Sequence, residues 1–307
     1  MSTNNSDLEA DGACASSFGT NRDLFTLPDS SHLGECLICC LPLSIDPSKS
    51  TFMPCCSKII CNGCDYANQK REVLQGLEKR CAFCREPAPK SKEECDKNIM
   101  KSIKRNDPVA MLEMGKQLYR EGKYEIALEY LTKAAELGDA DAHYNLSIRY
   151  DNGDGVEKDK RKEMYHLEKA AIGGHPEARH NLGYYDWNNG RFERARKHWI
   201  IAANLGCHES LKGLRVLYAS GYASKEDYAD ALRAYQTAVE AAKSSEREEA
   251  EAIMKLWTLL NSSGSMHHRK ELTIRSVLTT RVTASADEDE YHVNWTRGDM
   301  VSCKDNN

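Results

Sequence analysis

The feature that most restricts the fold of this chain is a cluster of cysteines. The 307 residues include thirteen cysteines, and nine of them lie between Cys36 and Cys84. Three pairs have the spacing Cys-x-x-Cys, and two more cysteines are adjacent in the stretch PCCSKIICNGC. Disulfides, a redox pair and a metal cluster are the three chemical explanations, and each requires a different compartment and spacing.

The rest of the chain favours metal. The N-terminal stretch MSTNNSDLEADGACASSFGT has neither a basic region nor an apolar run, so we predict no signal peptide. No apolar stretch approaches the ~20 residues that span a bilayer, so we expect no membrane contact. The expected location is intracellular, cytoplasmic or nuclear, where stable disulfides are disfavoured. The odd number of clustered cysteines and the lack of a βαβ pattern also argue against disulfide and redox chemistry.

Zinc fits the spacing of the cysteines. A Cys-x-x-Cys turn directs two thiolates at one ion, and Zn²⁺ requires four such ligands at ~2.3 Å in a tetrahedron. The three pairs fall two ligands short of two sites: Cys36 and Cys39, Cys61 and Cys64, Cys81 and Cys84. No histidine lies between residues 36 and 84, so the adjacent Cys55 and Cys56 are the remaining candidates. Four thiolates leave no position for water, so we expect a structural metal rather than zinc-catalysed hydrolysis.

The order and spacing of these pairs over residues 34–89 resemble the all-cysteine members of the RING finger family. RING fingers bind two ions in a cross-brace. The resemblance implies one zinc on Cys36, Cys39, Cys61 and Cys64, and a second on Cys55, Cys56, Cys81 and Cys84. The family usually has a residue between the ligands of the second pair, so Cys40 could replace Cys55 or Cys56. Each structural zinc would supply on the order of 10 kcal/mol of folding free energy.

RING fingers also bind a ubiquitin-charged conjugating enzyme and hold its thioester in a reactive pose, without a covalent intermediate of their own. The resemblance implies a docking groove with contact candidates Ile38, Pro54, Phe83, Arg85 and Pro87. Arg85 matches the position where active members often have an arginine. Asn68 and Ala82 depart from a frequent tryptophan and proline, which weakens the groove. Ile38, Phe83 and Pro87 could instead pack under the zinc loops, and Arg85 could be a solvated charge.

Residues 107–243 repeat themselves. KAAELGDADAHYNL (133–146), KAAIGGHPEARHNL (169–182) and IAANLGCHESLKGL (201–214) align. Spacings of four and then three residues place three stripes on single helix faces: Ala127-Leu131-Ala134, Ala195-Trp199-Ala202 and Ala231-Tyr235-Ala238. A helix pair of this kind cannot bury its apolar face alone, so the units stack. We therefore predict a right-handed stack of antiparallel helix pairs in which Leu131 and Trp199 are buried.

This region resembles the Sel1-like and tetratricopeptide helical repeats. The loop YDNGDGVEKD, with Gly153, Gly155, Val156 and Asp159, is typical of Sel1-like units. The resemblance implies about four units, a concave surface that holds another protein, and no active site in the repeats. Candidates for a strip that contacts a partner are Tyr144, Tyr184, Tyr185 and Trp187, although any of them could instead belong to the core between repeats. The recurring His143, His175, His180, His198 and His208 are expected to be polar positions rather than metal ligands.

The predicted architecture is a small zinc-stabilised RING-like α+β module at 34–89, followed by an all-α helical-repeat solenoid at 107–243. The flanking segments are a disordered acidic tail (1–33), a charged linker or leading helix (90–106), a capping helix (244–261) and a disordered tail (262–307). The net charge of −5 arises within residues 1–35, which hold six acidic residues and one basic residue. The remainder lacks the basic bias of a nucleic-acid binder.

Two functions follow from this architecture. The first is a RING-type E3 ubiquitin ligase, in which the zinc module recruits a conjugating enzyme and the repeats bind an unknown protein substrate. The alternative is a non-enzymatic adaptor for protein–protein interaction, in which the zinc module is a rigid binding surface. A zinc-dependent nucleic-acid binder is disfavoured by the charge.

Overall fold

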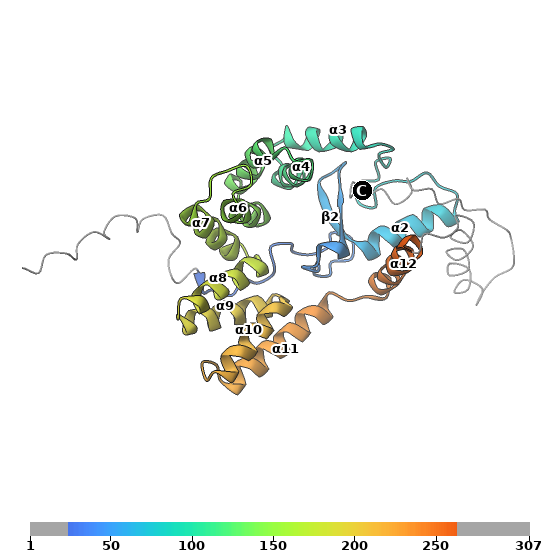
Figure 1. The fold of residues 1–307 in the computed structure, drawn as a ribbon. Coiled ribbons are helices and arrows are strands. Elements are labelled where there is room, and N and C mark those ends of the chain that lie inside the picture. Colours follow the sequence, from blue (N-terminus) through green and yellow to red (C-terminus); the bar gives the residue numbers. More distant parts are fainter. Residues whose placement is uncertain (1–23, 263–307) are drawn as a thin grey trace, which may run out of the picture.

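The computed structural model describes residues 24–262 (Figure 1). Its elements are the 3-10 helix η1 (Pro47–Lys49), strands β1 (Ser50–Met53) and β2 (Lys58–Cys61), and helices α2 (Asn62–Leu74), α3 (Lys92–Ile103), α4 (Pro108–Arg120), α5 (Tyr124–Glu136), α6 (Ala140–Asn152), α7 (Lys160–Ile172), α8 (Pro176–Asn188), α9 (Phe192–Asn204), α10 (His208–Ala219), α11 (Lys225–Ala241) and α12 (Ser245–Ser262). Helices therefore dominate the described part of the chain.

Helices α4 to α11 form an arch in which each helix packs against its neighbour in sequence (Figure 1). The helix α3 leads into the arch and packs against α4. The prediction of an all-α repeat stack is confirmed. In this part of the chain, consecutive helices associate because each carries one apolar face that only a neighbouring helix can cover.

The small and large residues of the repeats create this packing. Leu131 and Trp199 are each 2% exposed, which confirms their predicted burial. A Cβ atom on Gly183 in α8 or on Gly213 in α10 would come within 2.6 Å of the Trp199 ring atoms. The two glycines therefore provide the space that lets the indole lie between these helices.

The Gly-rich loop between α6 and α7 has backbone requirements that explain its sequence. Gly153 ends α6 with a φ of 81°, in the left-handed region that favours glycine. Gly155 has a φ of 74°, and a Cβ atom there would lie 2.6 Å from the Cβ of Tyr124. The side chain of Asp159 then accepts hydrogen bonds from the backbone amides of Arg161 and Lys162 and caps α7.

The cysteine-rich segment lies on the inner side of the arch (Figure 1). Strands β1 and β2 pair antiparallel, with Ser50 opposite Cys61 and Met53 opposite Lys58. Phe52 in β1 packs against a cluster that contains Ile99 in α3 and Met114 in α4. The chain's own hairpin thus covers part of the inner face that the repeat resemblance had assigned to a partner.

The structure corrects the predicted capping helix. We expected residues 244–261 to cap the end of the repeats, but α12 packs against α2 of the cysteine-rich segment. Lys70 in α2 pairs with Glu249 at 2.7 Å, and Lys49 pairs with Glu251 at 3.1 Å. Acidic residues of α12 thus pair with lysines of the cysteine-rich segment.

The predicted disordered tail 1–33 also needs a correction. Residues 24–33, which we call the N-terminal strap, lie against the repeats, whereas residues 1–23 are outside the described part of the chain. Leu24 is 6% exposed and packs in one cluster with Leu167 and Leu182. His32 donates its backbone N–H to the carbonyl oxygen of Gly174 at 3.1 Å. The strap mixes polar residues with Leu24, Phe25, Leu27 and Leu33, and it is anchored to the repeats near both of its ends.

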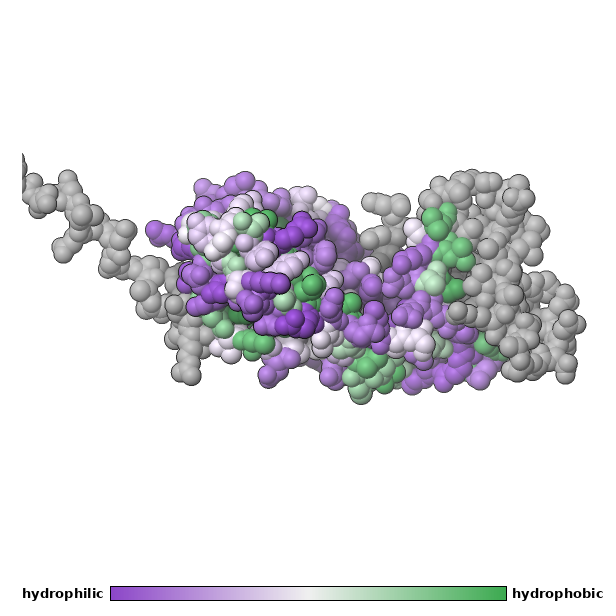
Figure 2. Space-filling view, turned by 90° about the horizontal axis from the view of Figure 1, so that it is seen from below, coloured by the Kyte–Doolittle hydropathy of each residue, from purple (hydrophilic) through white to green (hydrophobic). Residues whose placement is uncertain are grey.

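The surface seen from below is largely hydrophilic, with smaller separate hydrophobic patches (Figure 2). None of the helices within residues 24–262 combines the length and the apolar character needed to cross a bilayer.

Candidate metal centre and protein-binding surfaces

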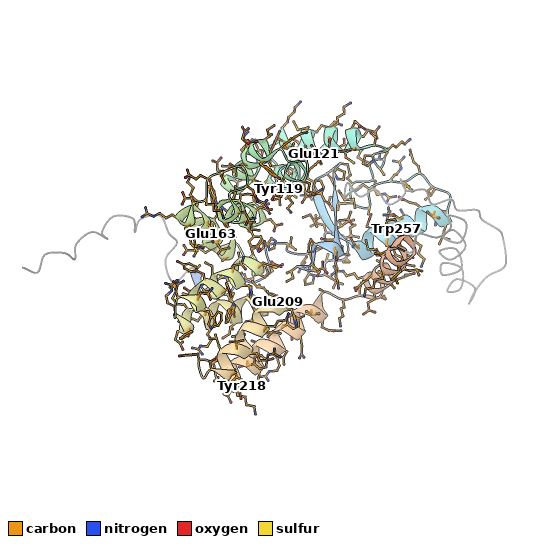
Figure 3. The ribbon with its side chains drawn as sticks, in the orientation of Figure 1. Tyr119, Glu121, Glu163, Glu209, Tyr218 and Trp257 are labelled. Carbon is orange, nitrogen blue, oxygen red and sulfur yellow. The ribbon has the colours of Figure 1, made fainter. Side chains whose placement is uncertain are left out.

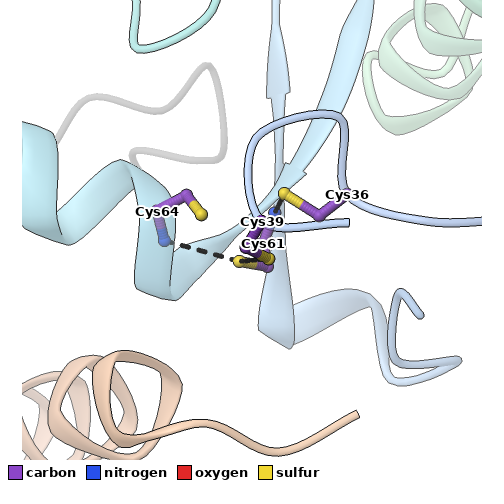
Figure 4. A group of neighbouring side chains, drawn as sticks. All are labelled: Cys36, Cys39, Cys61 and Cys64. Carbon is purple, nitrogen blue, oxygen red and sulfur yellow. Dashed lines mark hydrogen bonds between the residues drawn. The ribbon is translucent and has the colours of Figure 1, made fainter. Parts of the chain in front are cut away.

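The first group of thiols comes from three elements (Figure 4). Cys36 and Cys39 lie in the loop before η1, Cys61 ends β2, and Cys64 lies in the first turn of α2. Their four sulfur atoms lie within 4.8 Å of one another. The sulfurs of Cys39 and Cys61 are 3.8 Å apart.

The second group joins two turns. Cys55 and Cys56 lie in the turn between β1 and β2, and their sulfurs lie within 4.8 Å of those of Cys81 and Cys84. The turn bends sharply after the adjacent cysteines, because Ser57 has a φ of 56° and donates its N–H to the carbonyl of Met53 at 2.8 Å. This bend lets two neighbouring thiols face the same point. Cys40 belongs to neither group and is exposed.

Both groups have a geometry that fits zinc. Ligands at ~2.3 Å in a tetrahedron lie about 3.8 Å from one another. The observed sulfur–sulfur distances include 3.8 Å for Cys39 and Cys61 and 3.9 Å for Cys56 and Cys81. Backbone N–H groups also donate to sulfurs, as from Cys64 to Cys61 at 3.4 Å. Each group can therefore bind one metal ion, and zinc as its occupant stays a prediction.

The electrostatics of the thiols point to a cation. The hydrogen bond from Cys61 lowers the pKa of the Cys36 thiol to about 4, and the same contact raises the pKa of the Cys61 thiol. Burial raises the pKa of the Cys64 thiol to about 12. Neighbouring thiolates repel each other, so the thiols alone cannot all ionise together. A dication removes this conflict by pairing with every thiolate.

Arg247 in α12 connects the first thiol group to the C-terminal helix. Its guanidinium donates to the sulfur of Cys39 at 3.3 Å and to the carbonyl oxygens of Leu41 and Pro42 at 3.2 and 2.7 Å. A Cβ atom on Gly63 would lie 2.8 Å from Arg247, so only glycine allows this approach. The cation lies where a zinc site with four thiolates would carry excess negative charge.

The structure places the candidates for conjugating-enzyme contact in different environments. Ile38 and Phe83 are 41% and 39% exposed, and Pro87 is exposed, whereas Pro54 is buried. Arg85 is exposed but not free: it donates to the side-chain oxygen of Asn68 at 2.6 Å. It also lies 3.6 Å from the buried carboxylate of Glu72. Asn68, which departs from the RING pattern, therefore holds Arg85 against the module.

The predicted aromatic strip is not a continuous exposed surface. Tyr184 is 54% exposed, but Trp187 packs against the core between α9 and α10. Tyr144 packs on His175 with ring centroids 4.2 Å apart. Lys160 and Arg191 lie over the ring of Tyr185. The strip fails as a unit because three of its members complete packing between repeats or pair with cations.

Of the histidines singled out in the repeats, His175 joins a cluster with Asp141 and with His32 of the N-terminal strap. The Nε2 atoms of His32 and His175 lie 2.9 and 3.0 Å from the same carboxylate oxygen of Asp141. The Nδ1 of His175 accepts a hydrogen bond from the amide of Ala178, so its proton is on Nε2. We therefore interpret this group as a hydrogen-bonded latch on the strap. His180 bonds to Ser210, His143 to His166, and His208 is exposed.

Comparison with known proteins identifies the repeats. A model of the Sel1 repeat matches residues 108–139, 140–175 and 176–207. The chain therefore contains Sel1 repeats, which coincide with the helix pairs α4–α5, α6–α7 and α8–α9. The pair α10–α11 continues the stack beyond the matched residues.

Relatives share this part of the chain. The chain is 31% identical over 115 residues to chitin synthase regulatory factor 4 of Schizosaccharomyces pombe, an alignment that covers 35% of this chain and 18% of that protein. A Sel1 repeat protein from Oxalobacter formigenes is 27% identical with a TM-score of 0.43, covering 56% of this chain and 70% of that chain. The antigen c5321 of uropathogenic Escherichia coli, which has an SLR fold, is 23% identical with a TM-score of 0.39, and the match covers 55% of this chain and 36% of that chain.

Two arginines that make long-range contacts were missed by sequence reasoning. Arg247 lies 208 residues from Cys39, and Arg179 in α8 lies more than 150 residues from its partners in the strap. The one available signal for Arg247 was Gly63 inside the CNGC stretch, since a glycine in the first turn of a helix suggests a close approach. Arg179 had no signal, because it lies in an ordinary helical segment, between Ala178 and His180.

Proposed function

We propose that the protein is an interaction adaptor. In this proposal the Sel1 repeats hold one protein, and the cysteine-rich module, organised by two structural zinc ions, presents a second surface. The observation that carries the proposal is the docking of α12 on α2 through Arg247. This contact returns the chain from the end of the repeats to the module, so the two surfaces keep a fixed relation to each other. A fixed relation between two binding surfaces is what an adaptor needs.

Each surface carries exposed apolar side chains. On the module, Leu37, Ile38 and Phe83 are 52%, 41% and 39% exposed. On the repeats, Tyr184 in α8 and Tyr218 in α10 are 54% and 45% exposed, and Tyr218 lies toward the end of the arch that is distant from Trp257 (Figure 3). The name of the Schizosaccharomyces pombe relative describes a regulatory factor, which fits a role exerted through another protein.

Quantitative affinity purification tests the adaptor. Full-length protein is compared with Ile38→Asp on the module and Tyr184→Asp on the repeats, and an exposed lysine variant, Lys212→Asp, serves as a control for surface charge. We expect two sets of partners, each lost from one variant and kept in the other. Partner sets that stay equal in all variants, or that fall together in both, would contradict two separate surfaces.

A RING-type E3 ligase is a second candidate. The observation that favours it is that Ile38 and Phe83 are exposed, and that α12 contacts α2 through Gly63, Tyr66 and Lys70 rather than through Asn68. The side of α2 beside Arg85 is thus left available for a conjugating enzyme. Arg85 would have to exchange its hydrogen bond to Asn68 for one to ubiquitin.

An autoubiquitination assay over a panel of conjugating enzymes distinguishes the two candidates. Wild type, Ile38→Ala and Arg85→Ala are compared at equal zinc content. Activity in wild type that is lost in both variants would support the ligase and this groove. Absence of activity with every enzyme of the panel would favour the adaptor without ubiquitin transfer.

A further inference from the structure

The N-terminal strap fills a cleft between α7 and α9. Leu24 packs with Leu167 and Ala171 of α7 and with Leu182 of α8. The ring of Phe25 lies 4.7 Å from that of His198 in α9. Leu24 and Phe25, which lie where the chain turns at the start of the strap, therefore connect α7 and α8 with α9 through apolar and aromatic contacts.

The floor of this cleft is a buried cation. Arg179 is fully buried, and its guanidinium donates to the carbonyl oxygens of Leu24 and, at 3.3 Å, of Thr26. Burial lowers its pKa to about 10. Among residues 24–262, no carboxylate lies within 4.0 Å of its nitrogen atoms, and its Nε has no hydrogen-bond partner. A buried guanidinium satisfied only by peptide carbonyls gains stability from any ligand that brings a carboxylate.

The rim of the cleft adds two cations, of which Arg194 pairs with the buried carboxylate of Asp186 at 3.2 Å. Arg194 and Lys197 lie over the face of Phe25, with 5.2 and 5.4 Å between the cation and the ring centroid. His198 is fully buried beside them; it forms no hydrogen bond, but its Nε2 lies 3.5 Å from the carboxylate of Asp186. The cleft thus combines an apolar pocket, an aromatic position under two cations, and the unpaired Nε of the buried Arg179. This combination fits an acidic peptide with an apolar and an aromatic residue side by side.

The strap is anchored near both ends, and Arg179 also donates to the carbonyl oxygen of Thr26 at 3.3 Å. Between Phe25 and His32, the residues Thr26, Leu27, Asp29 and Ser30 are exposed. The second anchor is the hydrogen bond of His32 to Asp141. A segment with an exposed middle can be replaced one anchor at a time, without unfolding a repeat.

Resting on the proposed adaptor function, we propose that the α7–α9 cleft is an exchangeable peptide site, and that the strap occupies it in cis until a partner peptide replaces it. The partner carries the pattern acidic–apolar–aromatic. Its leucine-like side chain takes the place of Leu24, its ring lies under Arg194 and Lys197, and its carboxylate reaches the cationic floor. In the sequence, Asp23-Leu24-Phe25 has this pattern, although Asp23 lies outside the described residues.

Peptide binding to the full chain tests the exchange. The probe is a fluorescent peptide of residues 22–32, followed by anisotropy. In wild type the tethered strap competes at an effective concentration on the order of millimolar. The double variant Leu24→Ala, Phe25→Ala removes this competitor, so we expect the peptide to bind it at least about tenfold more tightly than wild type.

Three variants in the double-variant background identify the site. Arg179→Gln and the exposed rim change Lys197→Glu should each weaken peptide binding. If a thermal melt shows that Arg179→Gln is unfolded, Lys197→Glu alone tests the site, and it should still weaken binding. Arg215→Gln, an exposed arginine outside the cleft, should change nothing. A peptide with Asn in place of Asp23 should bind less tightly. Equal binding to wild type and the double variant, or no effect of Lys197→Glu, overturns the exchange. The affinity purifications then decide the fate of the adaptor separately. If Tyr184→Asp and Ile38→Asp each still lose their own set of partners, the proposed adaptor function holds even though the α7–α9 cleft is not a peptide site.

Discussion

The cysteine module and the repeat stack bury different kinds of groups. In the module, the buried cluster consists of Leu43, Met53 and Ile60 together with cysteines. In the stack, clusters of alanine and leucine recur along the arch, and Trp199 fills the largest gap. The stack therefore holds itself by apolar burial, whereas the buried cluster of the module consists largely of thiols that can bind metal. The contrast teaches that one chain can combine a region with an apolar core and a region whose core offers metal ligands. The two regions contact each other through α12 on α2 and through Phe52 on α3 and α4.

The largest expected effect is on metal content. Because two groups of four thiols are present, purified protein should contain two zinc ions, each contributing on the order of 10 kcal/mol to folding of the module. Cys36→Ser and Cys84→Ser should each lose metal and unfold residues 34–89, and atomic absorption with circular dichroism checks both. Cys40→Ser is the matched control and should keep both ions. One ion in the wild type, or two in Cys55→Ser, Cys56→Ser, would contradict the assignment.

The next effect separates the stack from the module. Trp199→Ala leaves a cavity between Gly183 and Gly213 and should lower the free energy of unfolding of the repeats by ~3–5 kcal/mol, measured by urea denaturation. Zinc content should not change. Trp257→Ala is the control, since this tryptophan is 38% exposed on α12 and should cost less than about 1 kcal/mol. Equal costs for the two tryptophans would mean that the stack does not depend on this contact.

A pH effect of intermediate size should arise in the stack. Burial, with help from Arg179 and Arg194, lowers the pKa of His198 from 6.5 to about 3, so the folded state keeps this histidine neutral. The unfolded chain binds the proton first, so stability is complete above pH 6.5 and falls as the pH drops toward 3. Between pH 8 and pH 5 the loss from His198 is about 2 kcal/mol. His198→Gln should flatten the pH dependence of urea unfolding, and an unchanged slope would contradict a neutral buried His198.

The smallest effect concerns the contact between α12 and the cysteine-rich module. Arg247→Gln removes the charge-assisted bond to Cys39 and should lower the thermal stability of the module by the equivalent of ~1–2 kcal/mol, with the repeats unaffected. Lys255→Gln, an exposed change on the same helix, is the control. Calorimetry should show the shift in the Arg247 variant only. A shift of equal size in both variants would mean that the contact at Cys39 does not hold α12.

Local patterns explain why the stack could be predicted. Ala195, Trp199 and Ala202 lie on one helical face at fixed spacing, and all three are buried. The cysteine pairs could also be recognised, because the two members of each pair are close in the sequence. The contacts of Arg247 and of the strap could not be predicted, because they join residues more than 100 positions apart and depend on how the arch closes. A short segment such as residues 24–33, in which apolar residues do not recur at the period of a helix or a strand, gives no periodic signal, even when two of its side chains are held.

Hydrogen exchange of the full chain with and without excess chelator tests the division most directly. If zinc organises the module and α12 depends on the module, removal of metal should increase exchange in β2, α2 and α12. Helices α6 to α9 should keep their protection. Uniform loss of protection across the repeats, or unchanged exchange in α2 and α12, would contradict the account.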